Sequence, residues 1–484
     1  MRTRLLGTIA AVAAGAGGAL AQGPPPPMPI GMAGGPGSGV MPASGAADPI
    51  APPLGMMGGP GMGGPIMGGP GMGGDPMGGM GGTGMGGPMY PPPGPYGASP
   101  YEKVSNAGVN GRLAARMWTD VDFMLSFVPR QPIQGPLLTS GPPAGNAILG
   151  QVGTTVQAGQ RSLGYGVFTG FNIHTGLFWD DNRRHGFELG GFLTELRTNR
   201  VDVASDATGQ PQYARPFINA VNGQPSTLLV SFPTYASGSA SVFTASRSYG
   251  AEGSFVTNLF RSCPDDCGPG KCLWDINLLG GFRYLSLEEE LRVSQTTGVL
   301  AGNAAPFDGK SYTGPVQIEV SDSFRNANRF YGGQVGLKSA LVCDRWLLQS
   351  TLKAAFGVIH EELTVDGFST LTSGVTRSVV PGGLYANSAN IGKYSNDEFG
   401  FIPEVSLSLG YQWSSWFSTR VGYNGLYINR VARPGDQYTT TVNPGVIPTN
   451  FGYGQGGNVA VPSPILSQTD FYLQGVSLGF TVRY

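Results

Sequence analysis

The stretch LQGVSLGFTVRY, residues 473–484, alternates between two kinds of side chain. Val476, Leu478, Phe480 and Val482 are apolar, whereas the positions between them carry Gly, Ser, Thr and Arg. Successive side chains of a β-strand point to opposite faces, so this period predicts a strand with one apolar and one polar face. A soluble β-sandwich packs the apolar face on a second sheet, whereas a membrane barrel turns it toward lipid.

The same alternation recurs along the chain, and the connections alternate in length. Four short connections separate five long ones, which is the layout of an outer-membrane barrel with tight turns at one end and long loops at the other. We therefore predict an all-β fold, an antiparallel transmembrane β-barrel of ten strands, or of twelve if STLLVSFPTY within 198–246 adds a hairpin. The ten segments lie at about 115–127, 164–178, 186–197, 247–260, 274–287, 329–342, 346–359, 403–413, 416–428 and 471–484.

A soluble sandwich fits these segments less well than a barrel does. The segments exceed the usual strand length of about five or six residues. Their polar face is rich in Gly, Ser, Thr, Asn and Gln, and aromatic residues gather at strand ends, as in a membrane girdle. The aromatic residues at strand ends are Trp179, Phe187, Trp274, Trp346, Trp413 and Trp416.

The sequence before the barrel divides into two parts. Residues 1–21 combine two arginines, an apolar core and a closing Ala-Leu-Ala, which predicts a secretory signal peptide. Residues 22–107 consist mainly of Gly, Pro and Met, and we expect a disordered linker there, because little apolar surface offsets the entropy cost of ordering it. Its methionines offer soft ligands for Cu(I), but they are evenly spread rather than clustered. The barrel domain is predicted over 108–484.

Composition excludes several classes of function. Only 12% of the residues are charged and the formal net charge is −1, so no basic surface is available for nucleic acid. With three histidines in the chain, we expect no cofactor, no metal site and no catalytic residues. The expected partners are outer-membrane lipid, the barrel-assembly machinery and small polar solutes.

Four cysteines fit an exported protein. Cys263, Cys267 and Cys272 occupy one short connection, and Cys343 opens another at the same end of the barrel. Three pairings of two disulfides are open, and we predict one bridge within the first turn and one from this turn to Cys343. A four-cysteine zinc site is the alternative, although no C-x2-C pair is present.

The polar face of the predicted strands carries charges of both signs. These side chains form either a packed, ion-paired plug or a narrow aqueous pore with weak ion preference. We expect a porin-like passive path for small polar solutes, with a non-conducting barrel that presents surface loops as the alternative. The predicted lumen residues are Asp120, Asp122, Glu188, Glu252, Asp275, Arg283, Lys338, Lys353, Glu404, Arg420 and Arg483.

An outer-membrane hydrolase is the remaining alternative and would need one of the histidines beside a nucleophile. His174 lies on the polar face of its strand, His185 lies in a charged tight turn, and His360 precedes two glutamates at a strand end. None of these positions offers a triad that lipid could reach.

Several segments resemble the planctomycete putative β-barrel porin family numbered seven. The likeness rests on WTDVDFMLSFVPRQPIQGPLLTS, GFRYLSLEEEL, NRFYGGQVGLKS, PEVSLSLGYQW, VGYNGLYINRVARPGDQ and the closing LQGVSLGFTVRY, and it covers about residues 112–484. It implies an exported outer-membrane barrel and names no substrate. Within it, Arg433-Pro434-Gly435-Asp436 is typical of a turn.

The last strand also carries a candidate assembly signal. Tyr484 ends the chain as an aromatic residue, and Phe480 precedes it on the same apolar face. Outer-membrane barrels as a class resemble one another in this pattern. We expect the insertion machinery to bind this strand by β-augmentation before it closes the barrel.

Overall fold

A computed structural model describes residues 116–159, 163–262, 272–455 and 461–484. The predicted signal peptide, the linker, Cys263 and Cys267 lie outside these residues. Within the described ranges, no helix has the length and apolar character needed to cross a membrane.

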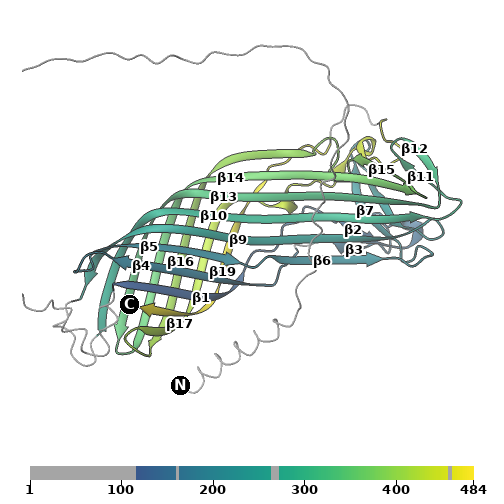
Figure 1. The fold of residues 1–484 in the computed structure, drawn as a ribbon. Coiled ribbons are helices and arrows are strands. Elements are labelled where there is room, and N and C mark those ends of the chain that lie inside the picture. The colour runs from purple at the N-terminus through teal and green to yellow at the C-terminus, as the bar shows by residue number, and fades with distance from the viewer. Residues whose placement is uncertain (1–115, 160–162, 263–271, 456–460) are drawn as a thin grey trace, which may run out of the picture. The chain divides into compact units, whose positions relative to one another are not determined.

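Ten antiparallel strands in the described part of the chain close into a ring (Figure 1). The ring closes where β19 pairs with β1, from Trp118–Arg483 to Phe127–Gln474. The prediction of a ten-stranded barrel is therefore confirmed. In order around the ring, the strands are β1 (Met117–Phe127), β4 (Val167–Phe178), β5 (His185–Thr194), β9 (Ala236–Arg261), β10 (Cys272–Val299), β13 (Val316–Cys343), β14 (Trp346–Ser373), β16 (Gly392–Gln412), β17 (Phe417–Ala432) and β19 (Gln468–Arg483).

The outer face of the ring is apolar over a limited height. On β10 the outward side chains from Trp274 to Tyr284 are apolar, aromatic or glycine, and Glu288 and Arg292 follow farther along the same face. A membrane-spanning strand needs roughly 9–11 residues, which matches this stretch. The apolar stretch is therefore the height at which the barrel meets lipid. Exposed apolar side chains at this height come from most strands and include Phe171, Leu189, Phe255, Phe282, Val335, Phe356, Leu407, Val421 and Leu478.

Tryptophans mark the short-turn end of the ring. Trp179, Trp274, Trp346, Trp413 and Trp416 are all more than half exposed, and each lies in or beside a short connection. Amphipathic indole rings favour the level of the lipid headgroups. The short-turn end therefore lies at one membrane interface.

Four strands continue far beyond the lipid-facing height, where the sequence led us to expect long loops. β9 has 26 residues, and β10, β13 and β14 have 28 each. Figure 1 shows these four strands running side by side away from the ring. β6 (Arg197–Ala204) extends this sheet beside β9, and β15 (Thr376–Pro381) extends it beside β14.

A small second sheet packs against this extension. It contains β2 (Leu138–Ser140), β3 (Thr155–Ala158), β7 (Tyr213–Asn219), β8 (Pro225–Ser231) and β18 (Thr441–Val442). We call the extended sheet, this small sheet and the β11–β12 hairpin (Ala304–Phe307, Lys310–Thr313) the head. The segment STLLVS forms part of β8, which pairs with β7, so it adds no hairpin to the ring.

The head has a core of its own. The inner face of the long strands continues with apolar residues after the outer face has turned polar, as in Leu291 and Val293 of β10 and Phe324 of β13. These side chains pack against Leu138 and Phe217 of the small sheet. Two sheets that bury their facing apolar sides make a sandwich, which explains why ordered strands replace the expected loops.

Candidate functional site

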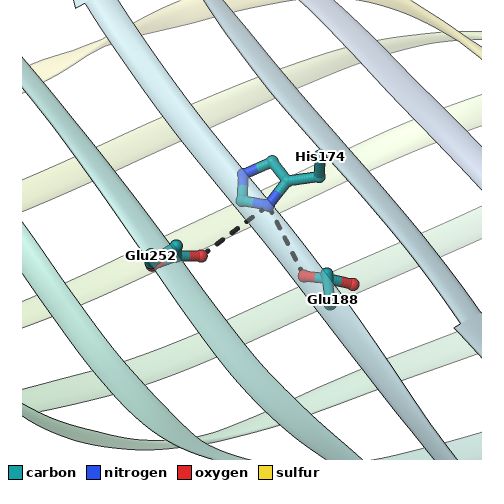
Figure 2. A group of neighbouring side chains, drawn as sticks. All are labelled: His174, Glu188 and Glu252. Carbon is teal, nitrogen blue, oxygen red and sulfur yellow. Dashed lines mark ion pairs between the residues drawn. The ribbon is translucent and has the colours of Figure 1, made fainter.

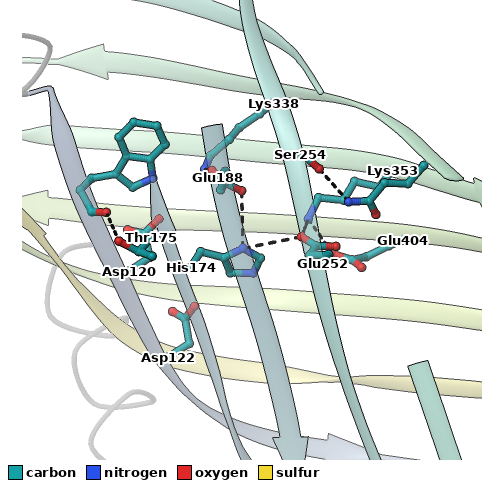
Figure 3. A network of polar contacts seen from close by, with 12 residues as sticks. Asp120, Asp122, His174, Thr175, Glu188, Glu252, Ser254, Lys338, Lys353 and Glu404 are labelled. Atoms are coloured by element: carbon teal, nitrogen blue, oxygen red, sulfur yellow. Dashed lines mark hydrogen bonds and ion pairs between the residues drawn. The ribbon is translucent and has the colours of Figure 1, made fainter. Parts of the chain in front are cut away.

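Charged side chains from most strands meet inside the ring, in the half that is nearer the short connections. The period of two brings every second residue to the inner face, and all eleven predicted lumen residues lie there. Figure 3 shows part of this network, including Asp120, Glu188 and Glu252. Arg261 is a twelfth, because a register shift between Ile276 and Asn277 lets it reach Asp275. Six carboxylates therefore face six basic groups.

Arg420 anchors one side of this network. Its Nη1 donates to Asp120 Oδ1 at 2.6 Å, and its Nη2 donates to Asp122 Oδ2 at 2.6 Å. Nη1 also donates to Thr481 Oγ1 at 2.8 Å. Asp120 and Asp122 lie on β1 and Thr481 on β19, so one guanidinium ties together the two strands that close the ring.

Glu252 anchors the opposite side. Arg283 Nε donates to Glu252 Oε2 at 3.1 Å, and Lys353 Nζ donates to Glu252 Oε1. The Arg283 guanidinium also donates to Glu404, whose carboxylate lies 3.8 Å from Lys353. Glu252 and Lys353 are nearly buried, so the pairing offsets the cost of removing their charges from water.

His174 of β4 faces two carboxylates, Glu188 of β5 and Glu252 of β9 (Figure 2). Its Nδ1 lies 3.5 Å from Glu188 Oε1 and 3.7 Å from Glu252 Oε1. Ligand atoms of a tetrahedral zinc site are separated by roughly 3.3–3.4 Å, given bonds of about 2.0–2.1 Å, so the spacing alone is compatible with a metal ion.

The surrounding bases argue against that use. Glu188 also accepts from Lys338 Nζ at 2.6 Å, and Glu252 is already paired with Arg283 and Lys353. A divalent cation between these carboxylates would lie beside three basic groups, which opposes its binding. The arrangement therefore fits an ion-paired network of side chains better than a metal site.

The other two histidines have different surroundings. His360 Nδ1 lies 2.7 Å from Asp397 Oδ1 on the outer surface, and the His185 ring stacks on Trp179. The partners of His174 and His360 are carboxylates and not hydroxyl nucleophiles. These contacts give no support to a serine-type hydrolase.

An apolar layer lies above the charged network, between it and the head. We define the apolar layer by six inward side chains, which are buried against one another and at most 2% exposed. Water filling the lumen at this height would expose them. They come from six different strands and are Leu285, Phe330, Ile359, Ile402, Ile428 and Phe471.

Arg433, at the exit of β17, closes the mouth above the apolar layer. Its Nε and Nη2 donate to Glu289 of β10 at 2.8 Å each, and its Nη1 donates to the Arg130 carbonyl at 3.0 Å. Burial acts to lower the pKa of Arg433, but the Glu289 carboxylate outweighs it and raises the pKa above its ordinary value. Pro434–Asp436 forms a short 3-10 helix, so the predicted turn also carries a buried ion pair.

Further contacts draw the end of β17 and the start of β19 across the lumen. Asn328 of β13 donates from Nδ2 to the Ala432 carbonyl at 2.9 Å and accepts from the Ala432 N–H at 2.8 Å. Gln468 Nε2 donates to Glu361 Oε2 of β14 at 2.9 Å. The two strands therefore lean over the mouth instead of continuing the wall.

Small cavities remain among the charged side chains. One of about 70 Å³ is lined by residues that include Asp122, His174 and Arg420, and another of about 60 Å³ touches Glu252 and Leu426. A water molecule occupies roughly 10–15 Å³ on this measure, so each cavity holds a few waters. A hollow of about 100 Å³ lies at the short-turn end beside Arg483.

The disulfide and the closing strand lie at the same short-turn end. Cys272 and Cys343 are bonded and join β10 to β13. Tyr484 exchanges backbone hydrogen bonds with Met117 at 3.0 and 3.1 Å, and its hydroxyl lies 2.8 Å from Thr119 Oγ1. Phe480 points outward beside Phe417.

The apolar layer was not predicted from the sequence, although one stretch of the sequence indicates it. In GFRYLSLEEEL, Leu285 and Leu287 share the inward register of Arg283 and Glu289. Two leucines between charged residues on the inward face indicate a level of the lumen from which water is excluded. The alternation in the sequence does not place Arg261 in the lumen, because its position depends on the register shift.

Comparison with known proteins places this barrel in a family. The model of the family described as putative beta barrel porin-7 matches residues 118–484. The chain belongs to this family. The putative beta barrel porin-7 match spans all ten strands of the ring, and the protein is an outer-membrane β-barrel whose apolar outer face meets lipid. No curated protein matches the sequence.

Solved structures of other outer-membrane barrels are similar to this member of the porin-7 family at low identity. The outer membrane protease OmpT of Escherichia coli is 8% identical with a TM-score of 0.32, and the match covers 77% of this chain and 97% of that chain. The toluene transporter TodX of Pseudomonas putida is 8% identical with a TM-score of 0.19 and coverages of 79% and 93%. OmpT of Vibrio cholerae is 9% identical with a TM-score of 0.11 and coverages of 76% and 97%. These similarities carry no argument about activity.

Proposed function

We propose that this protein is a closed outer-membrane barrel that anchors its head at the membrane surface. The observation that carries the proposal is the apolar layer, in which Phe330, Ile359 and Ile402 close the lumen with exposures of 1% or less. An ion or polar solute at that level would lose its hydration without gaining partners, and this costs several kcal/mol or more. The Arg433–Glu289 pair at the mouth adds a second barrier.

A passive path for small polar solutes is the second candidate. The water-sized cavities in the charged network and the hollow beside Arg483 favour it. Ions could enter from the short-turn end and pass along a lumen lined by both signs of charge. Such a path would require the apolar layer to move aside.

Liposome swelling separates the two candidates. Vesicles that contain the purified barrel are diluted into isotonic solutions of a small sugar, and light scattering reports entry of the sugar. The closed barrel gives the slow trace of protein-free vesicles. Swelling at a rate that increases with the amount of barrel would reject the closed state and favour the passive path.

We also propose a route of assembly. One edge of β19 stays available to the insertion machinery until it pairs with β1, because β17, its other neighbour, is the preceding strand of the ring, whereas β1 is the first. A machinery that binds its edge would hold the last strand in place while the others fold.

A further inference from the structure

The wall of the ring has a seam between β16 and β17. Their backbone ladder runs from Gln412–Ser418 to Glu404–Leu426 and ends there, although both strands continue toward the head. Pro403, the next residue on β16, has no N–H to donate. β17 bends away after a register shift between Ile428 and Val431, where Arg430 has a φ of 50°.

Side chains bridge the seam in place of the backbone. Asn429 Oδ1 accepts from the Phe401 N–H at 2.6 Å, and Asn429 Nδ2 donates to the Phe399 carbonyl at 3.3 Å. Arg430 Nη1 lies 3.1 Å from Glu398 Oε2. One amide side chain therefore supplies the bonds that a neighbouring strand would otherwise make.

A hollow of about 640 Å³ lies in the outer wall at the foot of this seam. Ala354, Pro403 and Gly425 are small residues on its floor, and they come from three adjacent strands. Its rim includes the outward side chains of Leu352 and Tyr472, which are 56% and 43% exposed. The hollow therefore lies within the lipid-facing height of the barrel and is lined mainly by apolar groups.

We propose that this hollow binds one acyl chain of an outer-membrane lipid. The surrounding medium is hydrocarbon, and an empty space against the wall would forfeit the dispersion contacts that a chain supplies. Tyr427 and Tyr472 line the hollow and are register partners on its head side. Phenol groups at this level suit the polar part of the lipid.

Gly425 offers a direct way to fill the hollow. A Cβ at Gly425 would meet Val405 Cγ1 at 3.3 Å, so a side chain there adapts by a small shift of a flexible neighbour. Gly253 on β9 is a matched control, because it also faces outward and its Cβ would meet Phe187 Cζ at 3.3 Å. Gly425→Trp therefore adds an indole ring inside the hollow, and Gly253→Trp adds the same ring to the lipid-facing surface outside it.

Native mass spectrometry of the full chain in detergent, titrated with palmitoyl-oleoyl phosphatidylethanolamine, tests the proposal. Wild type and Gly253→Trp bind one lipid before any further lipids, and Gly425→Trp binds this first lipid at least tenfold more weakly, which corresponds to about 1.4 kcal/mol. Ala354→Phe fills the hollow from β14 and gives the same loss, so a folding defect in one variant does not decide the test. Heat-modifiable gel migration checks that each barrel is folded.

Three results would overturn the proposal. If the wild-type protein binds all lipids with similar affinity, it has no specific site for one lipid. Equal binding by wild type and both hollow-filling variants places the lipid elsewhere. Equal loss in the hollow-filling variants and Gly253→Trp shows that the lipid is merely part of the shell around the barrel.

Discussion

Arg433 and Glu289 form a buried two-point ion pair, with Nε–Oε2 and Nη2–Oε1 both 2.8 Å, although they lie 144 residues apart in sequence. The pair joins the exit of β17 to β10 above the apolar layer, with side chains that are 1% and 0% exposed. A buried carboxylate left without its partner is strongly destabilising, because neither water nor another cation replaces it. Removal of Arg433 would leave the buried Glu289 carboxylate without this partner.

Arg433→Met should therefore lower the free energy of unfolding by about 3–5 kcal/mol. Urea unfolding of the barrel refolded in lipid vesicles measures this loss. Arg247→Met is the matched control, because Arg247 also pairs with a glutamate of β10, at 2.6 Å from Glu288, but is 46% exposed. We expect the control to cost less than about 1 kcal/mol. Equal losses in the two variants would show that the mouth is not closed by the buried pair.

Glu361 should make the stability of the mouth depend on pH. Burial raises the pKa of this carboxyl, and its Oε1 has no hydrogen-bond partner among the residues that the structure describes. A raised pKa contributes stability that is fully present below the unfolded value, about 4.3 for Glu, and is lost as the pH rises through the folded value. Glu361→Gln should therefore raise the urea midpoint at pH 8 and leave it nearly unchanged at pH 4. A lower midpoint at pH 8 would mean that the ionised carboxylate stabilises the mouth.

The disulfide should hold the short-turn ends of β10 and β13 together. The joint variant Cys272→Ser, Cys343→Ser should lose about 2–4 kcal/mol of stability, because a loop of 71 residues is no longer closed in the unfolded chain. Non-reducing peptide mapping should find these two cysteines linked, with the second predicted bridge between Cys263 and Cys267. Free thiols at all four positions would contradict both bridges.

The last strand should be needed for assembly as well as for closure. Replacement of Phe480 and Tyr484 together by Asp should leave the protein exported but stranded outside the membrane and degraded, because the insertion machinery no longer binds this strand. Cell fractionation with an antibody to the head measures the yield. Val221→Asp, at an exposed position of the head, serves as the control and should assemble normally. A normal membrane yield of the double variant would assign Phe480 and Tyr484 to lipid contact alone.

The ring could be predicted from sequence because lipid imposes a regular pattern. At the lipid-facing height, apolar residues such as Val476, Leu478 and Phe480 alternate with small and polar ones. The alternation of short and long connections predicts which strands are neighbours in the ring. The head follows a different rule. Beyond Tyr284, the outer face of β10 turns polar while Leu291 and Val293 face a second sheet, so the strand continues where the membrane pattern stops.

The proposed closure of the lumen depends on contacts between residues distant in sequence, which a period of two does not reveal. Asn328 and Ala432 bond across the mouth, and Arg433 finds Glu289 only because β17 bends inward. The motif Arg433-Pro434-Gly435-Asp436 was rightly expected to turn. The ion pair of Arg433 could not be predicted from the motif, because its partner Glu289 is distant in sequence.

Planar-bilayer recording tests the closed barrel most directly. The wild-type protein, inserted and checked for heat-modifiable migration, should give no stepwise conductance at either polarity. Phe330→Ala combined with Ile402→Ala removes side chains from the centre of the apolar layer and should produce brief openings. Long-lived ohmic steps from the wild-type protein, with the Arg433–Glu289 pair and the apolar layer intact, would contradict the account.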